Sequence, residues 1–273
     1  MGKQFWVERA RWGKYRIMPG PPSATRDDHD LATRVAAETA SLLVELRTRL
    51  SSEAVSPRTL RDSGDAAAHE LIMRLLAEER PDDTVLSEEG VPVAPDERLA
   101  QSRVWIVDPL DGTREFGEVP RTDWAVHVAL VIDGSPVAAA VALPGRDLVL
   151  ATSPAPPAPP PMKGAPRVLV SRTRPPAEAT LIADALGGEL VPLGSAGAKA
   201  MAVVLGEADV YAHSGGQYEW DSAAPVAVAR AAGLHTSRLD GSALVYNQPN
   251  LYLPDLLICR PELANAVIAA AAG

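Results

Sequence analysis

Residues 104–113 have the sequence VWIVDPLDGT, which joins a compact apolar run to a polar turn. The bulky apolar residues at 104–107 are typical of a fully buried strand. The proline that follows predicts a turn, and residues 111–113 predict the start of a helix. A strand end, a turn and a helix start in this order can bring the carboxylates of Asp108 and Asp111 to one point.

These two carboxylates, with the Leu110 carbonyl between them, would form the all-oxygen ligand set that a hard cation such as Mg²⁺ prefers. The amides of Gly112 and Thr113 would project from the helix start, where anions bind. The segment therefore predicts a metal site beside a phosphate site. An Asp-x-x-Asp sequence near a Pro-Gly turn is often only turn and capping chemistry, however, so further acidic residues have to decide.

Two other acidic segments favour the metal site. Glu88 and Glu89 follow a short predicted strand at 85–86, where paired acids are usually solvated but could add a carboxylate. Asp221 precedes a helix of small residues, where it could be a helix cap or another metal ligand. The chain thus offers carboxylates from three separate segments for one site.

Composition limits the classes of function. The chain has 273 residues, 47% of them hydrophobic, which is enough for one large core or two modest domains. The net charge of -9 disfavours nucleic-acid binding. The single cysteine and the scattered histidines do not form a zinc motif. The sequence lacks an apolar stretch of the roughly 18 residues needed to span a membrane, so we expect a cytoplasmic protein without membrane or nucleic-acid partners.

Apolar periodicity predicts two kinds of organisation along the chain. The first half should contain two helices, followed by an antiparallel meander that packs on them; the helices are expected at 30–50 and 65–79, and the strands at 85–86, 104–107, 124–132, 137–143 and 148–151. The second half alternates strands and helices, which is typical of an α/β sheet. Its strands are expected at 168–170, 190–191, 210–211 and 256–259, and its helices at 176–186, 196–205, 222–232 and from 261 onward.

The proline-rich segment 154–166 is the predicted boundary between two domains, at 27–153 and 167–273. A long hairpin loop inside a single domain would fit this segment equally well. Residues 1–26 are basic and contain a Pro-Gly-Pro-Pro run, and they predict a flexible N-terminal arm.

The combination of Glu88-Glu89, the DPLDGT sequence at 108–113 and Trp220-Asp221 resembles the inositol monophosphatase superfamily, whose members are magnesium-dependent phosphatases. The resemblance implies a layered αβαβα sandwich with two sheets, of α+β or α/β class. It implies two or three Mg²⁺ ions. The implied metal ligands are Glu88, Asp108, the Leu110 carbonyl, Asp111 and Asp221.

The resemblance also implies a mechanism without a covalent intermediate. Thr113 and Asp65 would orient and deprotonate a metal-activated water for in-line attack, with Glu88 as a further catalytic residue, and Gly112 and Thr113 would bind the phosphate. One position departs from the pattern, because Asp62 stands where family members usually have threonine. The contacts of that loop are therefore expected to differ.

Within the superfamily, the sequence Arg114-Glu115-Phe116 after the DPLDGT motif resembles the CysQ-type 3'(2'),5'-bisphosphate nucleotidases, in their actinobacterial form. This branch removes the 3'-phosphate of adenosine 3',5'-bisphosphate (PAP). Lys199 and Arg114 are candidates for the second phosphate, although ordinary surface positions would also fit. The implied substrate-binding residues are Gly112, Thr113, Arg114, Gly194, Ser195, Lys199, His213 and Asp221.

Two other functions remain open at this point. One is a phosphatase for inositol 1-phosphate or for sugar phosphates such as fructose 1,6-bisphosphate. The other is a non-catalytic nucleotide or metal sensor, which is disfavoured because such a protein should have lost one of the ligand positions. The resemblance also implies that the chain can form a homodimer.

Overall fold

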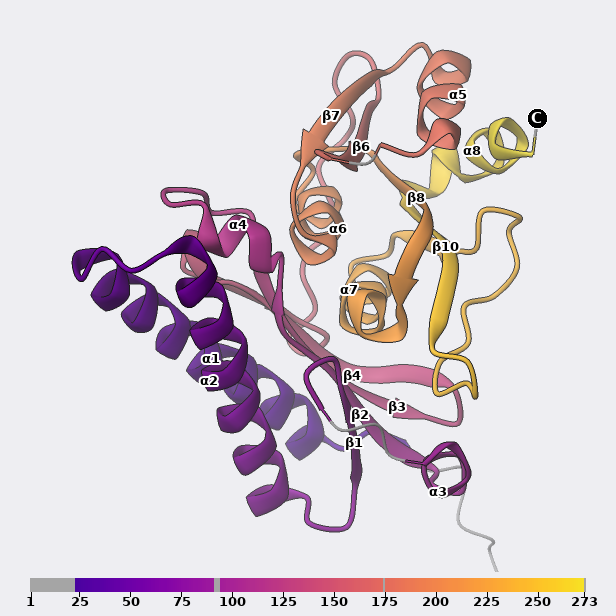
Figure 1. Cartoon of the computed structure of the whole chain (residues 1–273). Coiled ribbons are helices and arrows are strands. Elements are labelled where there is room, and N and C mark those ends of the chain that lie inside the picture. Colours follow the sequence, from indigo (N-terminus) through magenta and orange to yellow (C-terminus); the bar gives the residue numbers. More distant parts are fainter. Residues whose placement is uncertain (1–22, 91–93, 174, 273) are drawn as a thin grey trace, which may run out of the picture.

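The computed structural model describes residues 23–90, 94–173 and 175–272. Two five-stranded sheets are stacked with helices outside and between them, which gives five layers (Figure 1). Helices α1 (Arg26–Ser52) and α2 (Pro57–Glu79) cover the outer face of the first sheet. Helices α5 (Ala177–Leu186) and α8 (Ala264–Ala271) cover the outer face of the second. The predicted αβαβα sandwich is confirmed.

The first sheet has the strand order β1-β2-β3-β4-β5. The predicted antiparallel meander is confirmed for β2 to β5, but β1, which was predicted as part of it, is parallel to β2. The five strands are β1 (Thr84–Ser87), β2 (Arg103–Asp111), β3 (Ala125–Ile132), β4 (Ser135–Leu143) and β5 (Leu148–Ala151).

The turn predicted at Pro109 is wrong. Strand β2 continues to Asp111, and its pairing with β3 shifts register between Asp108 and Asp111. A bulge tolerates a residue without an N–H, so the proline is accommodated inside the strand. The predicted helix start is confirmed by the short helix α4 (Thr113–Gly117), which begins after Gly112.

Helix α2 begins at Pro57, well before the predicted start at Asp65. The Ser56 side chain accepts a hydrogen bond from the Thr59 amide, and proline at the first helical position has no N–H left to satisfy. Asp65 therefore lies inside the helix and not at its start. Of the predicted N-terminal arm, residues 1–22 lie outside the described residues, and Arg26 already belongs to α1.

The second sheet has the order β7-β6-β8-β10-β9 and is mixed. Strand β6 is parallel to β7 and β8, whereas β10 is antiparallel to β8 and β9. These strands are β6 (Arg167–Ser171), β7 (Glu189–Leu193), β8 (Val210–Tyr218), β9 (His235–Ser237) and β10 (Tyr252–Cys259). Strand β9, the short helix α3 (Pro95–Leu99) and the turn of 3₁₀ helix at Pro144–Arg146 were not predicted from the sequence, and the helix predicted from 261 begins with a 3₁₀ turn at Pro261–Leu263.

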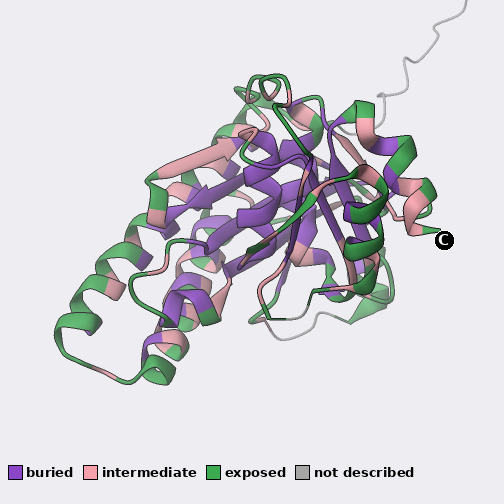
Figure 2. Cartoon of the chain, turned by 90° about the horizontal axis from the view of Figure 1, so that it is seen from above, coloured by how far each residue is buried: buried purple, intermediate pink, exposed green. Residues whose placement is uncertain are grey.

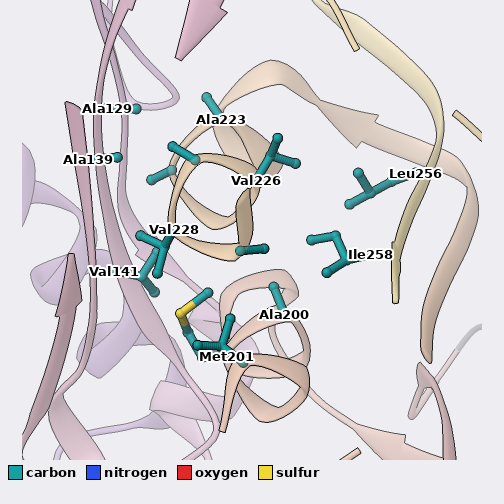
Figure 3. Close-up of a cluster of buried hydrophobic side chains, with 14 of the residues drawn as sticks. Ala129, Ala139, Val141, Ala200, Met201, Ala223, Val226, Val228, Leu256 and Ile258 are labelled. Atoms are coloured by element: carbon teal, nitrogen blue, oxygen red, sulfur yellow. The ribbon is translucent and has the colours of Figure 1, made fainter. Parts of the chain in front are cut away.

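The central layer consists of α6 (Ala196–Val204) and α7 (Glu219–Ala231). Its side chains belong to one apolar cluster that includes residues of both sheets: Val141 comes from β4, Met201 from α6, Val226 from α7 and Ile258 from β10 (Figure 3). The proline-rich segment joins β5 of the first sheet to β6 of the second. The division into two domains at this segment stays a prediction.

Burial follows the layers (Figure 2). The strands and the central helices are mostly buried, and exposed residues concentrate on the outer helices and the loops. Within the described ranges, every helix is too short or too polar to cross a membrane.

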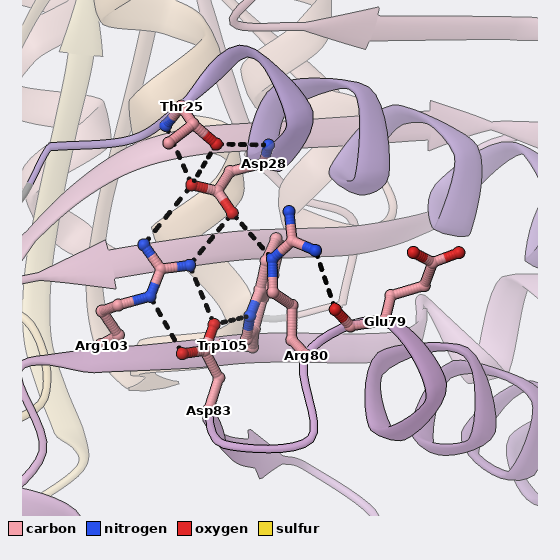
Figure 4. Close-up of polar contacts among 7 residues, drawn as sticks. All are labelled: Thr25, Asp28, Glu79, Arg80, Asp83, Arg103 and Trp105. Carbon is pink, nitrogen blue, oxygen red and sulfur yellow. Dashed lines mark hydrogen bonds and ion pairs between the residues drawn. The ribbon is translucent and has the colours of Figure 1, made fainter.

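A polar cluster fastens the start of α1 to the first sheet (Figure 4). Asp28 caps α1 together with Thr25, and its carboxylate also accepts hydrogen bonds from Arg80 and Arg103. Arg103 lies at the start of β2 and also binds Asp83, which follows α2. Burial raises the pKa of Asp28, but the hydrogen bonds from Arg103, Thr25 and Arg80 outweigh it and hold that pKa well below its usual range.

Candidate active site

Three carboxylates meet where the first sheet touches the central layer. Asp108 and Asp111 come from the end of β2, and Asp221 comes from the first turn of α7. One oxygen from each lies within 4.8 Å of the others. Asp221 is not the first capping residue, because α7 already begins at Glu219, but its carboxylate does cap the helix by accepting the Tyr218 amide at 2.6 Å.

The protonation of the three acids reflects this crowding. Burial and the neighbouring negative charges raise the pKa of Asp108 well above its ordinary value, and burial followed by the charge of Asp111 raises the pKa of Asp221 to about 7. Burial favours a higher pKa for Asp111 as well. The His127 ring, the Ser195 hydroxyl and a backbone amide of α6 outweigh burial and hold the pKa of Asp111 below its usual range. Asp111 is thus held ionised beside two acids whose pKa values are raised.

This donor set fits a divalent metal ion. Glu88 follows β1, and burial raises the pKa of its carboxyl to about 7. The Leu110 carbonyl accepts the Thr113 hydroxyl at 3.0 Å and keeps a second lone pair. Three of the five predicted ligands, Asp108, Asp111 and Asp221, therefore lie together, and this carboxylate triad could hold a metal ion.

The predicted pair of Asp65 and Thr113 is assembled as well. The Thr113 hydroxyl lies 3.3 Å from the Asp65 carboxylate and 3.0 Å from the Leu110 carbonyl. The hydroxyl carries one proton, so it donates to one of these acceptors at a time. Burial and the charge of Glu89 raise the pKa of Asp65 to about 7. A carboxyl group with this pKa can accept a proton near neutral pH.

A pocket of about 260 Å³ opens beside the triad. Asp111 and Asp221 line it, and so do all the residues that the resemblance implied for substrate binding: Gly112, Thr113, Arg114, Gly194, Ser195, Lys199 and His213. The structure thus brings together segments from both halves of the chain around one opening.

Two glycines at this opening are required by space. Gly112 has φ +84°, and a Cβ there would lie 3.0 Å from the Ser195 Cβ. A Cβ on Gly194 would lie 2.4 Å from Cγ of Glu115. These close approaches let the turn before α6 contact the end of β2, where the Ala196 and Gly197 amides donate to the Asp111 carboxylate at 3.1 and 2.6 Å.

The two predicted phosphate-binding cations differ in their surroundings. Lys199 is buried, donates to the Ser195 carbonyl and lies over the Tyr211 ring, and burial lowers its pKa. Arg114 is exposed on α4. Lys199 therefore stabilises the turn before α6 in addition to lining the pocket.

Sequence reasoning missed two residues of this site. Arg172, which follows β6, lines the pocket and donates from Nη2 to Glu115 and Glu118 at 2.8 Å each. His127 is fully buried between Asp111 and α7. A signal for His127 was available, because it is the one polar residue in the β3 sequence AVHVALVI. No comparable signal distinguished Arg172 from other arginines.

The chain is similar to known proteins over most of its length. The model of the inositol monophosphatase family matches residues 28–272. A "3'-phosphoadenosine 5'-phosphate phosphatase" of Mycobacterium tuberculosis is 50% identical over 270 residues, which cover 94% of this chain and 98% of that protein. The "3'(2'),5'-bisphosphate nucleotidase CysQ" of Escherichia coli is 32% identical and covers 70% of this chain and 81% of that protein.

Solved structures share the fold. CysQ from Bacteroides thetaiotaomicron superposes with a TM-score of 0.73 at 26% identity, covering 86% of this chain and 97% of that one. An inositol monophosphatase from Zymomonas mobilis has the same TM-score at 22% identity, covering 92% of this chain and 100% of that one, and supports the fold alone. With its fold, its carboxylate site and a match over nearly its whole length, this chain belongs to the inositol monophosphatase family.

Proposed function

We propose that this protein is a Mg²⁺-dependent phosphomonoesterase that hydrolyses the 3'-phosphate of PAP and releases AMP and phosphate. The observation that carries the proposal is the carboxylate triad beside the Thr113–Asp65 pair, open to a pocket lined with cations. The 50% identity to mycobacterial proteins named for this activity, over 94% of the chain, supports PAP as the substrate.

Asp108, Asp111 and Asp221 would hold two or three Mg²⁺ ions together with Glu88 and the Leu110 carbonyl. Bound Mg²⁺ would supply positive charge for the phosphate oxygens and make a bound water more acidic. The raised pKa values of Asp108 and Asp221 belong to the metal-free site, and a cation would keep both acids ionised.

The residues of the chain would orient the attacking water. Thr113 and Asp65 sit on α4 and α2, two helices in contact with each other, so their 3.3 Å contact is supported by packing. With Thr113 donating to Asp65, the threonine oxygen is left to accept a hydrogen bond from the water; as the water's proton passes to the threonine oxygen, the threonine's own proton would pass to Asp65. The Gly112 and Thr113 segment would hold the phosphate in line with this water.

The pocket would bind the rest of the nucleotide. Lys199 and Arg114 were the predicted contacts for the second phosphate, and Arg172 joins them as a third cation on the wall. Arg172 is held by Glu115 and Glu118, so less conformational freedom is lost when it binds an anion. The proposal retains a cytoplasmic enzyme without nucleic-acid or membrane partners, and it allows a homodimer.

The test compares substrates side by side. Phosphate release from PAP, inositol 1-phosphate and fructose 1,6-bisphosphate is measured with Mg²⁺, with EDTA, and with Mg²⁺ plus Li⁺. We expect the highest kcat/KM for PAP, no release in EDTA, and inhibition by Li⁺. A higher kcat/KM for inositol 1-phosphate would contradict the nucleotidase proposal, and absence of release from all three would favour the sensor.

A further inference from the structure

His127 lies where four elements of the site converge. It is in the middle of β3 and has 0% exposure. Its Nε2 lies 3.3 Å from the Asp111 carboxylate, and its Nδ1 lies 3.0 Å from the Trp220 carbonyl and 4.0 Å from the Asp108 carboxylate. The imidazole therefore contacts the end of β2 on one side and the first turn of α7 on the other.

The chemistry of these contacts defines a link between two candidate metal ligands. A carbonyl oxygen only accepts, so Nδ1 donates its proton to the Trp220 carbonyl. Trp220 immediately precedes Asp221, and the opposite ring nitrogen, Nε2, faces Asp111 at contact distance but without an aligned hydrogen bond to the described residues. The two aspartates come from different layers of the fold, more than one hundred residues apart in the chain. The His127 ring spans this gap directly.

Gly197 leaves the space that the His127 ring occupies. A Cβ on Gly197 of α6 would lie 2.1 Å from Nε2 of His127, closer than any real Cβ contact. The Gly197 amide donates to the same Asp111 oxygen at 2.6 Å. A glycine at this position thus lets both α6 and the imidazole reach Asp111, and neither can move without displacing the other.

We propose that His127 is a positioning residue that holds Asp111 and Asp221 at the spacing a divalent cation requires. The inference rests on the proposed metal-dependent function. Asp111 and Asp221 belong to different layers of the fold, so a contact between these layers is needed to fix the spacing of their carboxylates. Loss of the link should let α7 relax away from β2, and metal binding would then have to restore the geometry.

The two contacts can be removed separately. His127→Asn keeps a donor near the Nδ1 position, facing the Trp220 carbonyl, and loses the approach to Asp111. His127→Gln keeps an amide near the Nε2 position and loses the contact with Trp220. His127→Leu removes both. His235→Asn is the matched control, because His235 lies in β9 at the edge of the second sheet and contacts Ser237.

Mg²⁺ binding is measured by isothermal titration calorimetry on the substrate-free chain. We expect the Kd of His127→Leu to rise about 10- to 100-fold, with smaller rises for the Asn and Gln variants, as for other groups that orient metal ligands. His235→Asn should bind Mg²⁺ like the wild type. Melting temperatures in EDTA verify that each variant is folded, and if the Leu variant does not fold, the Asn and Gln variants decide.

Enzyme kinetics distinguish a positioning role of His127 from a general structural defect of the variants. We expect kcat to recover at saturating Mg²⁺, while the Mg²⁺ concentration for half-maximal activity rises with the Kd. The inference would be overturned if His127→Leu, or the Asn and Gln variants, fold and bind Mg²⁺ with wild-type affinity. It would also be overturned if kcat falls at every Mg²⁺ concentration while the Mg²⁺ affinity is unchanged. A wild-type chain that binds no divalent cation would instead refute the proposed function.

Discussion

Asp111 is the carboxylate of this site that is fixed by hydrogen bonds from the start of α6. Its two carboxylate oxygens accept the Ser195 hydroxyl and the amides of Ala196 and Gly197, and they also face His127. These partners keep Asp111 ionised while burial favours protonation of Asp108. The site therefore has one permanent negative charge around which a cation can assemble.

Asp111→Asn removes that charge and leaves the size of the side chain unchanged. We expect Mg²⁺-dependent phosphate release from PAP to fall by about 100-fold or more, because a metal site loses an anionic ligand. Asp240→Asn, in an exposed turn, is the control and should retain wild-type activity. Full activity of the Asp111 variant would show that the metal ligands have been assigned wrongly.

Arg172 is expected to select for the second phosphate. For Arg172→Gln we predict a loss of about 10- to 100-fold in kcat/KM for PAP, the range for one hydrogen bond to a charged group. The kcat/KM for 3'-AMP, which lacks the 5'-phosphate, should stay near the wild-type value. Arg114→Gln tests the other arginine in the same assay. An equal loss for both substrates would mean that Arg172 only tethers α4 to the end of β6.

At the scale of elements, ends and irregularities of secondary structure position the site. The bulge in β2 turns Asp108 and Asp111 toward the central layer, and the starts of α6 and α7 approach them from the second half. The first helix is fixed elsewhere, by the polar cluster around Asp28. That cluster is structural and lies apart from the pocket residues.

Asp28→Asn should destabilise the fold by about 2–3 kcal/mol at neutral pH, somewhat less than for fully buried pairs because the arginines keep some contact with water. The pKa of Asp28 is lower in the folded chain than its ordinary 3.8, so its stabilisation is present above that pH and is lost as pH falls toward the folded value. Urea unfolding at a series of pH values tests this. A difference between variant and wild type that stays constant down to about pH 3 would contradict it.

At the scale of the molecule, one apolar cluster joins both sheets through α6 and α7. The site lies at the edge of this cluster and takes residues from both halves of the chain. A site built in this way depends on the halves being held together, which is why the shared core matters for function as well as stability.

The shared core predicts cooperative unfolding. Urea transitions followed by circular dichroism and by tryptophan fluorescence should coincide. Met201→Ala, at a fully buried position in the cluster, should lower the free energy of unfolding by about 2–5 kcal/mol in both signals together. Two separate transitions would favour the predicted division into domains at the proline-rich segment. Ala270→Ser, a conservative change in the C-terminal helix, provides a control of small expected effect.

The sequence by itself determined most strands and the family, and it singled out Asp108, Asp111 and Asp221, which lie together in the structure. These inferences succeeded because apolar periodicity and a local motif depend on residues close together in the chain. Two predictions from the sequence were wrong. The start of α2 was placed too late because the Ser56 cap was overlooked. A turn was expected at Pro109, but pairing with β3 continues the strand, and the local turn preference of proline does not include the free energy of that pairing.

Only the tertiary structure decided which distant residues meet. His127 looked like an isolated polar residue in an apolar strand, and Arg172 like any arginine after a strand. The role of His127 depends on its contact with Trp220, which lies on α7 in the central layer. The role of Arg172, which follows a strand of the second sheet, depends on its contact with Glu115 on α4. Such contacts follow from the stacking of the five layers, and that stacking is fixed by the shared apolar core, not by any short stretch of the chain.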